Sequence, residues 1–190
     1  SISAEQLKQF RDAYLQAVSR FGIAPNKVMI HKGINNHKIA GLLAAAFPGA
    51  RFIELNRAPL DEAYGCYKQN FEFQHFSFTV DGIASEISLY REDMDWWHQV
   101  LSDRLNATTY ERLVEGFEEE LRRLLAWLGL PWDDTCLDFG RVSRVGTASM
   151  NQVREGVFTT AVGKYAKYGE LFSPFVKALE QRGVNVRSVS

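Results

Sequence analysis

The chain has 190 residues, which is long enough for one domain that buries roughly 70% of the surface its unfolded chain exposes. Its formal net charge of −1 and its pI near 6.4 exclude a general attraction to nucleic acid or to an anionic membrane, so any anion site must be local. The composition, 46% hydrophobic and 13% aromatic, is typical of a globular protein, and no run of about 18 apolar residues predicts a membrane span.

The amino-terminal segment predicts a helix. Residues 3–20 keep apolar side chains at a spacing of three to four residues, as one face of an amphipathic helix does, and they lack the apolar core of a secretory signal. Cys66 and Cys136 have no CxxC spacing and suit a reducing cytoplasm, with a disulfide between them as the alternative. With no internal repeat and no linker-like composition, we expect a single cytoplasmic domain over residues 1–190.

Short apolar strands alternate with helices along the rest of the chain. The predicted strands are VMI (28–30), RFIEL (51–55) and a short strand within NATTYERL (106–113). The predicted helices cover residues 36–47, 59–71, 82–101, 116–130 and 170–182. This alternation is typical of an α/β fold, in which helices flank a parallel sheet.

Turn and cap residues support these boundaries. Pro59 lies in the first turn of its helix, where proline is accepted best. Asp81 is expected to cap the helix over 82–101. Gly129 and Pro131 end the helix over 116–130.

Polar residues follow the predicted strands. Lys32, Arg57 and Tyr110 each lie at the carboxyl end of a strand, which is the edge of a parallel sheet where ligands bind. Arg57 also precedes the amino terminus of a helix, so its position suits an anion, although an arginine in a surface salt bridge is the alternative. Tyr110 is expected to stack on a ligand base or to be an ordinary aromatic residue at a strand end.

Metal chemistry is not expected. The four histidines, at positions 31, 37, 75 and 98, have no ligand spacing with cysteine or acidic residues. The sequence also contains no GxxxxGK[ST] motif and no glycine-rich PRSGT-like loop, one of which a nucleotide-binding α/β protein ordinarily carries after its first strand.

Four blocks in order resemble one protein family. They are VMIHKGINN, FPGARFIELNRAPLDEAYGCYKQNF, TYERLVEGFEEELRRLLAWLGLPWDDTCLDF and TASMNQVREGVFTTAVGKYAKY. They resemble the sulfotransferases that use 3′-phosphoadenylyl sulfate (PAPS), in particular the bacterial type often attached to tetratricopeptide repeats and related to tyrosylprotein sulfotransferases. The match covers almost the whole chain and looks like the carboxyl-terminal two thirds of the domain. It implies a P-loop NTPase-like sheet that lacks the first strand and the 5′-phosphosulfate loop.

The resemblance implies roles for residues in the middle of the chain. Arg57 corresponds to the arginine that binds the 3′-phosphate of PAPS, and Tyr110 to the tyrosine near the adenine. Gly65 stands where the family has a serine, eight residues after the arginine, so one hydroxyl contact is missing. Lys32 matches the lysine that steadies the bridging oxygen as the sulfuryl group leaves.

The last of the four blocks, residues 147–168, resembles the family's segment that closes over the cofactor and is called the closing segment. It supplies the remaining residues that the resemblance implies. Arg154 and Lys164 fall on its basic positions, and Ser149 lies near the position of a serine that holds the sulfuryl group in the family. The family's general base is a glutamate from a part of the domain that precedes Ser1, and His31 or His37 is the alternative. The chain is therefore expected to be the carboxyl-terminal piece of a longer protein, with a degenerate relative as the alternative.

Three functions compete at this stage. The resemblance favours transfer of a sulfuryl group to a hydroxyl or amine of a small molecule, glycan or protein tyrosine, with an upstream domain in the same protein and no metal. The second is a non-catalytic α/β module that binds a nucleotide or a protein. The third, a nucleotide kinase, is disfavoured because no Walker lysine or Mg²⁺-binding aspartate pair is visible.

Overall fold

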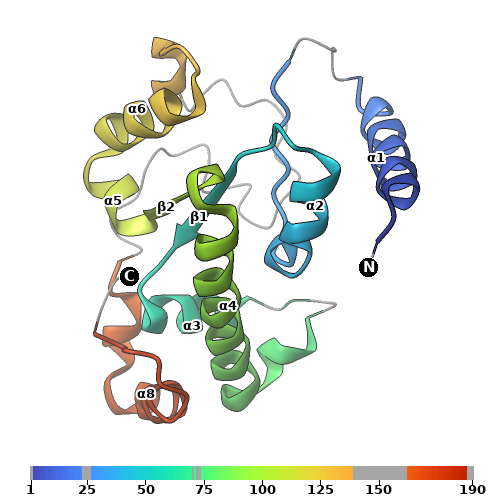
Figure 1. The fold of residues 1–190 in the computed structure, drawn as a ribbon. Helices are drawn as coiled ribbons and strands as arrows, with labels where there is room; N and C mark the ends of the chain where they lie inside the picture. Colours follow the sequence, from blue (N-terminus) through green and yellow to red (C-terminus); the bar gives the residue numbers. More distant parts are fainter. Residues whose placement is uncertain (1, 23–26, 70, 72–73, 139–161, 188–190) are drawn as a thin grey trace. The chain divides into compact units, whose positions relative to one another are not determined.

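The computed structural model describes residues 2–22, 27–69, 71, 74–138 and 162–187 (Figure 1). The chain divides into two compact units, Ser1–Phe52 with Tyr90–Leu105, and Ile53–Leu89 with Asn106–Ser190. Each unit is described by itself. The single domain predicted over residues 1–190 stays a prediction.

The first unit is helical in its described part. It contains α1 (Ala4–Ser19), the 3-10 turn η1 (Asn36–Ile39), α2 (Ala40–Ala46), the second half of α4 (Val80–Leu101) and the 3-10 turn η3 (Ser102–Arg104). The helices predicted over 3–20 and 36–47 are thereby confirmed, the second with a 3-10 first turn. A capping box begins α1, because the Ser3 side chain accepts the Gln6 N–H while the Gln6 side chain accepts the Ser3 N–H. The core of the unit is Ala40, Ala44, Met94, Leu101 and Leu105.

Two close approaches organise this unit. A Cβ at Gly41 would lie 2.7 Å from the ring of Trp97, so only glycine lets α2 pack so tightly against that ring. The Arg104 guanidinium donates to the carbonyls of Ala44, Phe47 and Ala50. Of these, the Ala44 carbonyl lies in the last turn of α2, where carbonyls have no partner within the helix, and the Phe47 and Ala50 carbonyls lie just beyond that helix.

The strand predicted at residues 28–30 is wrong. These residues form no strand, and Val28 and Ile30 are 66% and 88% exposed. A strand needs a neighbour to complete its hydrogen bonds, and the sheet found in the described residues consists of β1 and β2. The apolar character of VMI therefore does not indicate burial here.

The second unit mixes strands and helices. Strands β1 (Phe52–Asn56) and β2 (Leu105–Thr109) pair in a small parallel sheet, which agrees with the predicted α/β class. The other elements are α3 (Pro59–Lys68), η2 (His75–Phe78), the first half of α4, α5 (Tyr110–Glu115), α6 (Phe117–Leu128), η4 (Asp134–Leu137), η7 (Lys164–Phe172) and α8 (Ser173–Glu180). Figure 1 shows α8 close to α3. The core consists of Leu60, Ala63, Ile83, Ala84, Ile87, Phe172, Phe175, Leu179 and Val184.

Most boundaries follow the sequence signals. Pro59 occupies the first turn of α3, and Gly129 ends α6 in the left-handed region at φ 73°, as predicted. Asp81 is not the cap of α4, because that helix begins at Val80 and the Thr79 hydroxyl accepts the Gly82 N–H instead. The Asp81 carboxylate pairs with Arg182. Among the described residues, no helix combines the length and the apolarity needed to cross a membrane.

Candidate functional site

The turns that follow the two strands touch each other at two points. Arg57 and Ala58 connect β1 to α3, and Tyr110 and Glu111 open α5 directly after β2. The guanidinium carbon of Arg57 lies 4.6 Å from the centroid of the Tyr110 ring. The Ala58 N–H donates to Glu111 Oε1 at 3.0 Å. We call these two contacts the strand-end clasp.

The clasp orients Arg57. A guanidinium stacked on an aromatic ring gains about 0.5–2 kcal/mol, depending on how far it is desolvated. Stacking uses the face of the guanidinium and not the N–H groups in its plane, which are the groups that bind a phosphate bidentately. Arg57 also precedes α3, whose amino terminus carries partial positive charge. The geometry is therefore suited to a phosphate group.

Glu111 is a residue that the sequence reasoning missed. Its side chain is 8% exposed, and one carboxylate oxygen binds the backbone of the other turn. A glutamate in the first turn of a helix is usually explained by the helix dipole, so the sequence offered only its position next to Tyr110 as a signal.

A buried network of charged side chains links β2 to α6. Glu120 is 4% exposed and accepts hydrogen bonds from the Thr108 hydroxyl at 2.5 Å and from Arg123 at 2.7 and 3.0 Å. Arg112 lies 3.3 Å from the same carboxylate. The Arg123 hydrogen bond is the main reason why the pKa of Glu120 falls to about 2. The network fastens α6 to β2, the strand that directly precedes Tyr110.

The described part of the closing segment, which begins at residue 162, contacts α3. Asp61 Oδ2, in the first turn of α3, accepts the Gly163 N–H at 2.5 Å. Lys164 follows as the first residue of η7. The predicted binding residues Arg57, Tyr110 and Lys164 thus all belong to the second unit. Ser149 and Arg154 lie outside the described residues.

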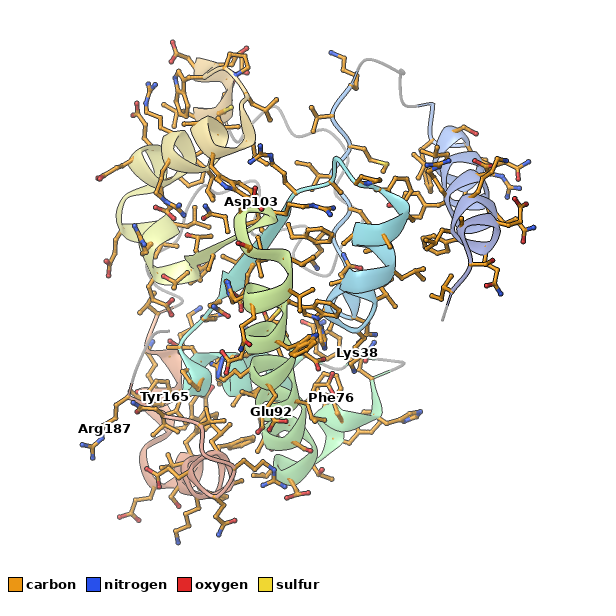
Figure 2. All side chains as sticks on the ribbon, viewed as in Figure 1. Lys38, Phe76, Glu92, Asp103, Tyr165 and Arg187 are labelled. Atoms are coloured by element: carbon orange, nitrogen blue, oxygen red, sulfur yellow. The ribbon has the colours of Figure 1, made fainter. Side chains whose placement is uncertain are left out.

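A hollow of about 570 Å³ adjoins these segments. Ala58 and Glu111 of the clasp line it, and so do Asp61 and Gly163. Figure 2 labels Tyr165 and Arg187, which belong to its wall as well. Carboxylates and apolar side chains make up much of that wall, so the hollow offers an anion less than the turn at Arg57 does.

Gly65 and Cys66 lie in the middle of α3. A Cβ at Gly65 would meet nothing within 4 Å, so the backbone leaves room for the serine that the family resemblance implies. Cys66 and Cys136 are free cysteines, and the disulfide alternative is therefore wrong. Burial raises the pKa of Cys66 to about 12, which keeps it a thiol at neutral pH and makes it a poor nucleophile.

Lys32 and the candidate histidine bases belong to the first unit. Lys32 is exposed and lies in an irregular segment, and the exposed His31 has its ring 5.7 Å from that of Tyr14. His37 is buried: its Nδ1 is 3.0 Å from the Ile34 carbonyl and its own carbonyl accepts the indole N–H of Trp97. An imidazole so enclosed is poorly placed to take a proton from an acceptor hydroxyl.

No metal centre is evident in the part of the chain that the structure describes. It contains no group of three or more His, Cys, Asp or Glu side chains that could hold a metal ion. The expectation that the protein works without a metal stays a prediction.

The fold and the clasp describe an α/β protein with an oriented arginine at the carboxyl end of a parallel strand. A sequence model described as the sulfotransferase family matches residues 3–134, which is more than half of the chain and includes Lys32, Arg57 and Tyr110. The chain therefore belongs to the sulfotransferase family.

One relative shows the extent of the match along the chain. The sequence is 32% identical over 180 residues to an uncharacterized protein of Aquifex aeolicus (strain VF5), an alignment that covers 92% of this chain and 24% of that protein. The chain thus spans about a quarter of the length of that relative. The repeat-associated bacterial subtype stays a prediction.

Proposed function

We propose that this chain forms part of an enzyme that transfers a sulfuryl group from PAPS to a hydroxyl or amine acceptor. The observation that carries the proposal is Arg57, which directly follows β1, stacks on Tyr110 and precedes the amino terminus of α3. Membership of the sulfotransferase family supplies the reaction class. The same proposal includes a P-loop-like sheet whose first strand is not part of this chain, and a cytoplasmic location.

Arg57 binds the 3′-phosphate of the donor. A charge-assisted hydrogen bond of this kind contributes about 1.5–3 kcal/mol. Tyr110 holds the guanidinium on one face of its ring and presents its remaining surface to the adenine. At Gly65 the side-chain hydroxyl of the family is absent, so backbone groups or water bind the phosphate there.

The closing segment completes the donor site. Lys164, at the start of η7, adds positive charge next to the first turn of α3. Arg154 and Ser149 are assigned by the family resemblance to the phosphate and the sulfuryl group.

Lys32 acts on the leaving group. The donor supplies a sulfuryl group, and as its bond to the 5′-phosphate breaks, negative charge grows on the oxygen left behind. The ammonium of Lys32 stabilises that charge, while the proton of the acceptor goes to a base. We place this base in a part of the domain outside this chain, because His37 is enclosed.

Two measurements on the full-length protein test the proposal. Transfer of labelled sulfuryl from PAPS to a panel of phenols, sugars, amines and tyrosine peptides tests catalysis, and calorimetry with adenosine 3′,5′-bisphosphate tests the donor site. We expect both transfer and binding. Binding without transfer to any acceptor would favour the non-catalytic nucleotide-binding module, and the absence of binding would overturn the donor assignment.

A further inference from the structure

Asp61 joins two distant parts of the second unit. It lies four residues after Arg57 in the first turn of α3 and is 1% exposed. Its Oδ2 accepts the N–H of Gly163, which is 102 residues away in sequence. Its Oδ1 is buried and has no hydrogen-bond partner among the residues that the structure describes. Burying a carboxylate in this way is costly, so the contact with Gly163 requires an explanation.

Gly163 is the N-cap residue of η7. Its backbone is left-handed, at φ +69°, a conformation that favours glycine, and Lys164 follows it directly. Apolar packing of Leu60 and Ala63 against Tyr165 and Phe172 holds the body of η7. Such packing has little directionality, whereas the hydrogen bond fixes one particular amide beside Lys164.

Electrostatics argue against a direct role for Asp61 in binding the donor. A carboxylate one helical turn from Arg57 repels a phosphate bound there, so its charge alone weakens anion binding. An acidic residue at this position favours phosphate binding only if it acts through another group. Lys164 is the charged residue next to the amide that Asp61 holds.

We propose that Asp61 is a positioning residue, which holds the Gly163 amide so that the Lys164 ammonium stays beside the phosphates at the amino terminus of α3. The inference rests on the proposed function, because it takes a donor phosphate as the ligand of Lys164. It assigns to the buried carboxylate the placement of Gly163 and Lys164 and no proton transfer.

A double-mutant cycle on the full-length protein tests this inference, with calorimetric affinity for adenosine 3′,5′-bisphosphate as the readout. Asp61→Ala should weaken binding about tenfold, as expected for losing one buried hydrogen bond. Asp61→Asn keeps an acceptor oxygen and should therefore lose less affinity for the bisphosphate than Asp61→Ala does. In a protein that already carries Lys164→Ala, Asp61→Ala should reduce the affinity by less than about twofold, because the two residues act on the same contact.

The control is Glu62→Gln, which removes a negative charge from the same helical turn. We expect it to leave affinity unchanged or slightly higher. We also expect the Gly163 amide to exchange with solvent faster in Asp61→Ala, while Asp61→Asn retains part of its protection. If Asp61→Ala does not fold, Asp61→Asn takes its place in the cycle.

The outcomes separate this inference from the proposed function. Tighter binding by Asp61→Ala would show that only its charge matters, and additive losses in the cycle would show that it does not act through Lys164. Unchanged affinity in Lys164→Ala would overturn the inference while Arg57 still carries the proposed function. Failure of the wild-type protein to bind the bisphosphate would overturn both.

Discussion

Replacing Arg57 by alanine tests the assignment of the 3′-phosphate. Two energies depend on this side chain: about 1.5–3 kcal/mol from a charge-assisted bond to phosphate, and about 0.5–2 kcal/mol from stacking on Tyr110, which contributes to the free protein as well. Only the energy of the bond to phosphate is therefore lost from the binding free energy. Arg57→Ala should therefore weaken adenosine 3′,5′-bisphosphate binding by about 10- to 150-fold.

A second ligand isolates the 3′-phosphate. Adenosine 5′-phosphate lacks that group, so its affinity should change by less than about threefold in the same variant. Arg57→Lys keeps the charge but loses the planar fork and the stack, and we expect an intermediate loss for the bisphosphate alone. Calorimetry with both ligands measures these differences, with thermal unfolding as a check on the fold.

Arg51→Ala serves as the matched control, since Arg51 is exposed and precedes β1 at its other end. It should leave both affinities unchanged. Equal losses for the two ligands in Arg57→Ala would refute the reasoning, because the arginine would then bind something common to both or act through the fold.

Three further changes extend the test. Lys32→Ala should reduce the rate of sulfuryl transfer by about 10²–10³-fold with a much smaller loss of donor affinity, and steady-state and binding assays that find an unchanged rate would remove Lys32 from the mechanism. Gly65→Ser should tighten bisphosphate binding by up to about 1 kcal/mol for one hydrogen bond, since the position is open; raised stability with unchanged affinity would place Gly65 away from the phosphate. Glu120, whose pKa falls from 4.5 to about 2, should contribute about 3 kcal/mol of stability that is fully present above pH 4.5 and is lost as the pH falls through 2. Denaturant unfolding between pH 6 and 2 should therefore show a flatter profile for Glu120→Gln than for the wild type, and parallel profiles would contradict this role.

The sequence predicted elements whose signals are local. Pro59 marked the start of α3 and Gly129 the end of α6, because each residue has a backbone preference that holds in almost any context. The strand predicted over residues 51–55 is β1, and its apolar run was the signal. The residues buried in it are Glu54 and Asn56, whereas Ile53 and Leu55 are exposed, so the run marked the strand but not its buried face. The strand prediction for residues 28–30 was wrong because a strand requires a neighbouring strand to pair with. Three apolar residues do not specify such a neighbour.

The candidate site was predicted as separate residues but not as an arrangement. Arg57 and Tyr110 were each singled out by their place after a strand, and the stack between them follows only from the pairing of β1 with β2. Glu111 and Asp61 were missed because their partners are backbone amides, at Ala58 and Gly163. A sequence does not reveal which distant amide lacks an acceptor, so buried carboxylates of this kind emerge only with the structure.

The capping of α2 by Arg104 has a consequence for the order of folding. A helix of seven residues is too short to persist alone in water, and the guanidinium that closes it is made 58 residues after Ala46, since 104 − 46 = 58. Residues 53–89, which belong to the second unit, lie between the two. During synthesis, α2 must therefore wait until this insertion has left the ribosome, and the first unit closes a long loop before it gains its core. Its amino-terminal half is therefore without its tertiary partners for longer than the order of its helices suggests.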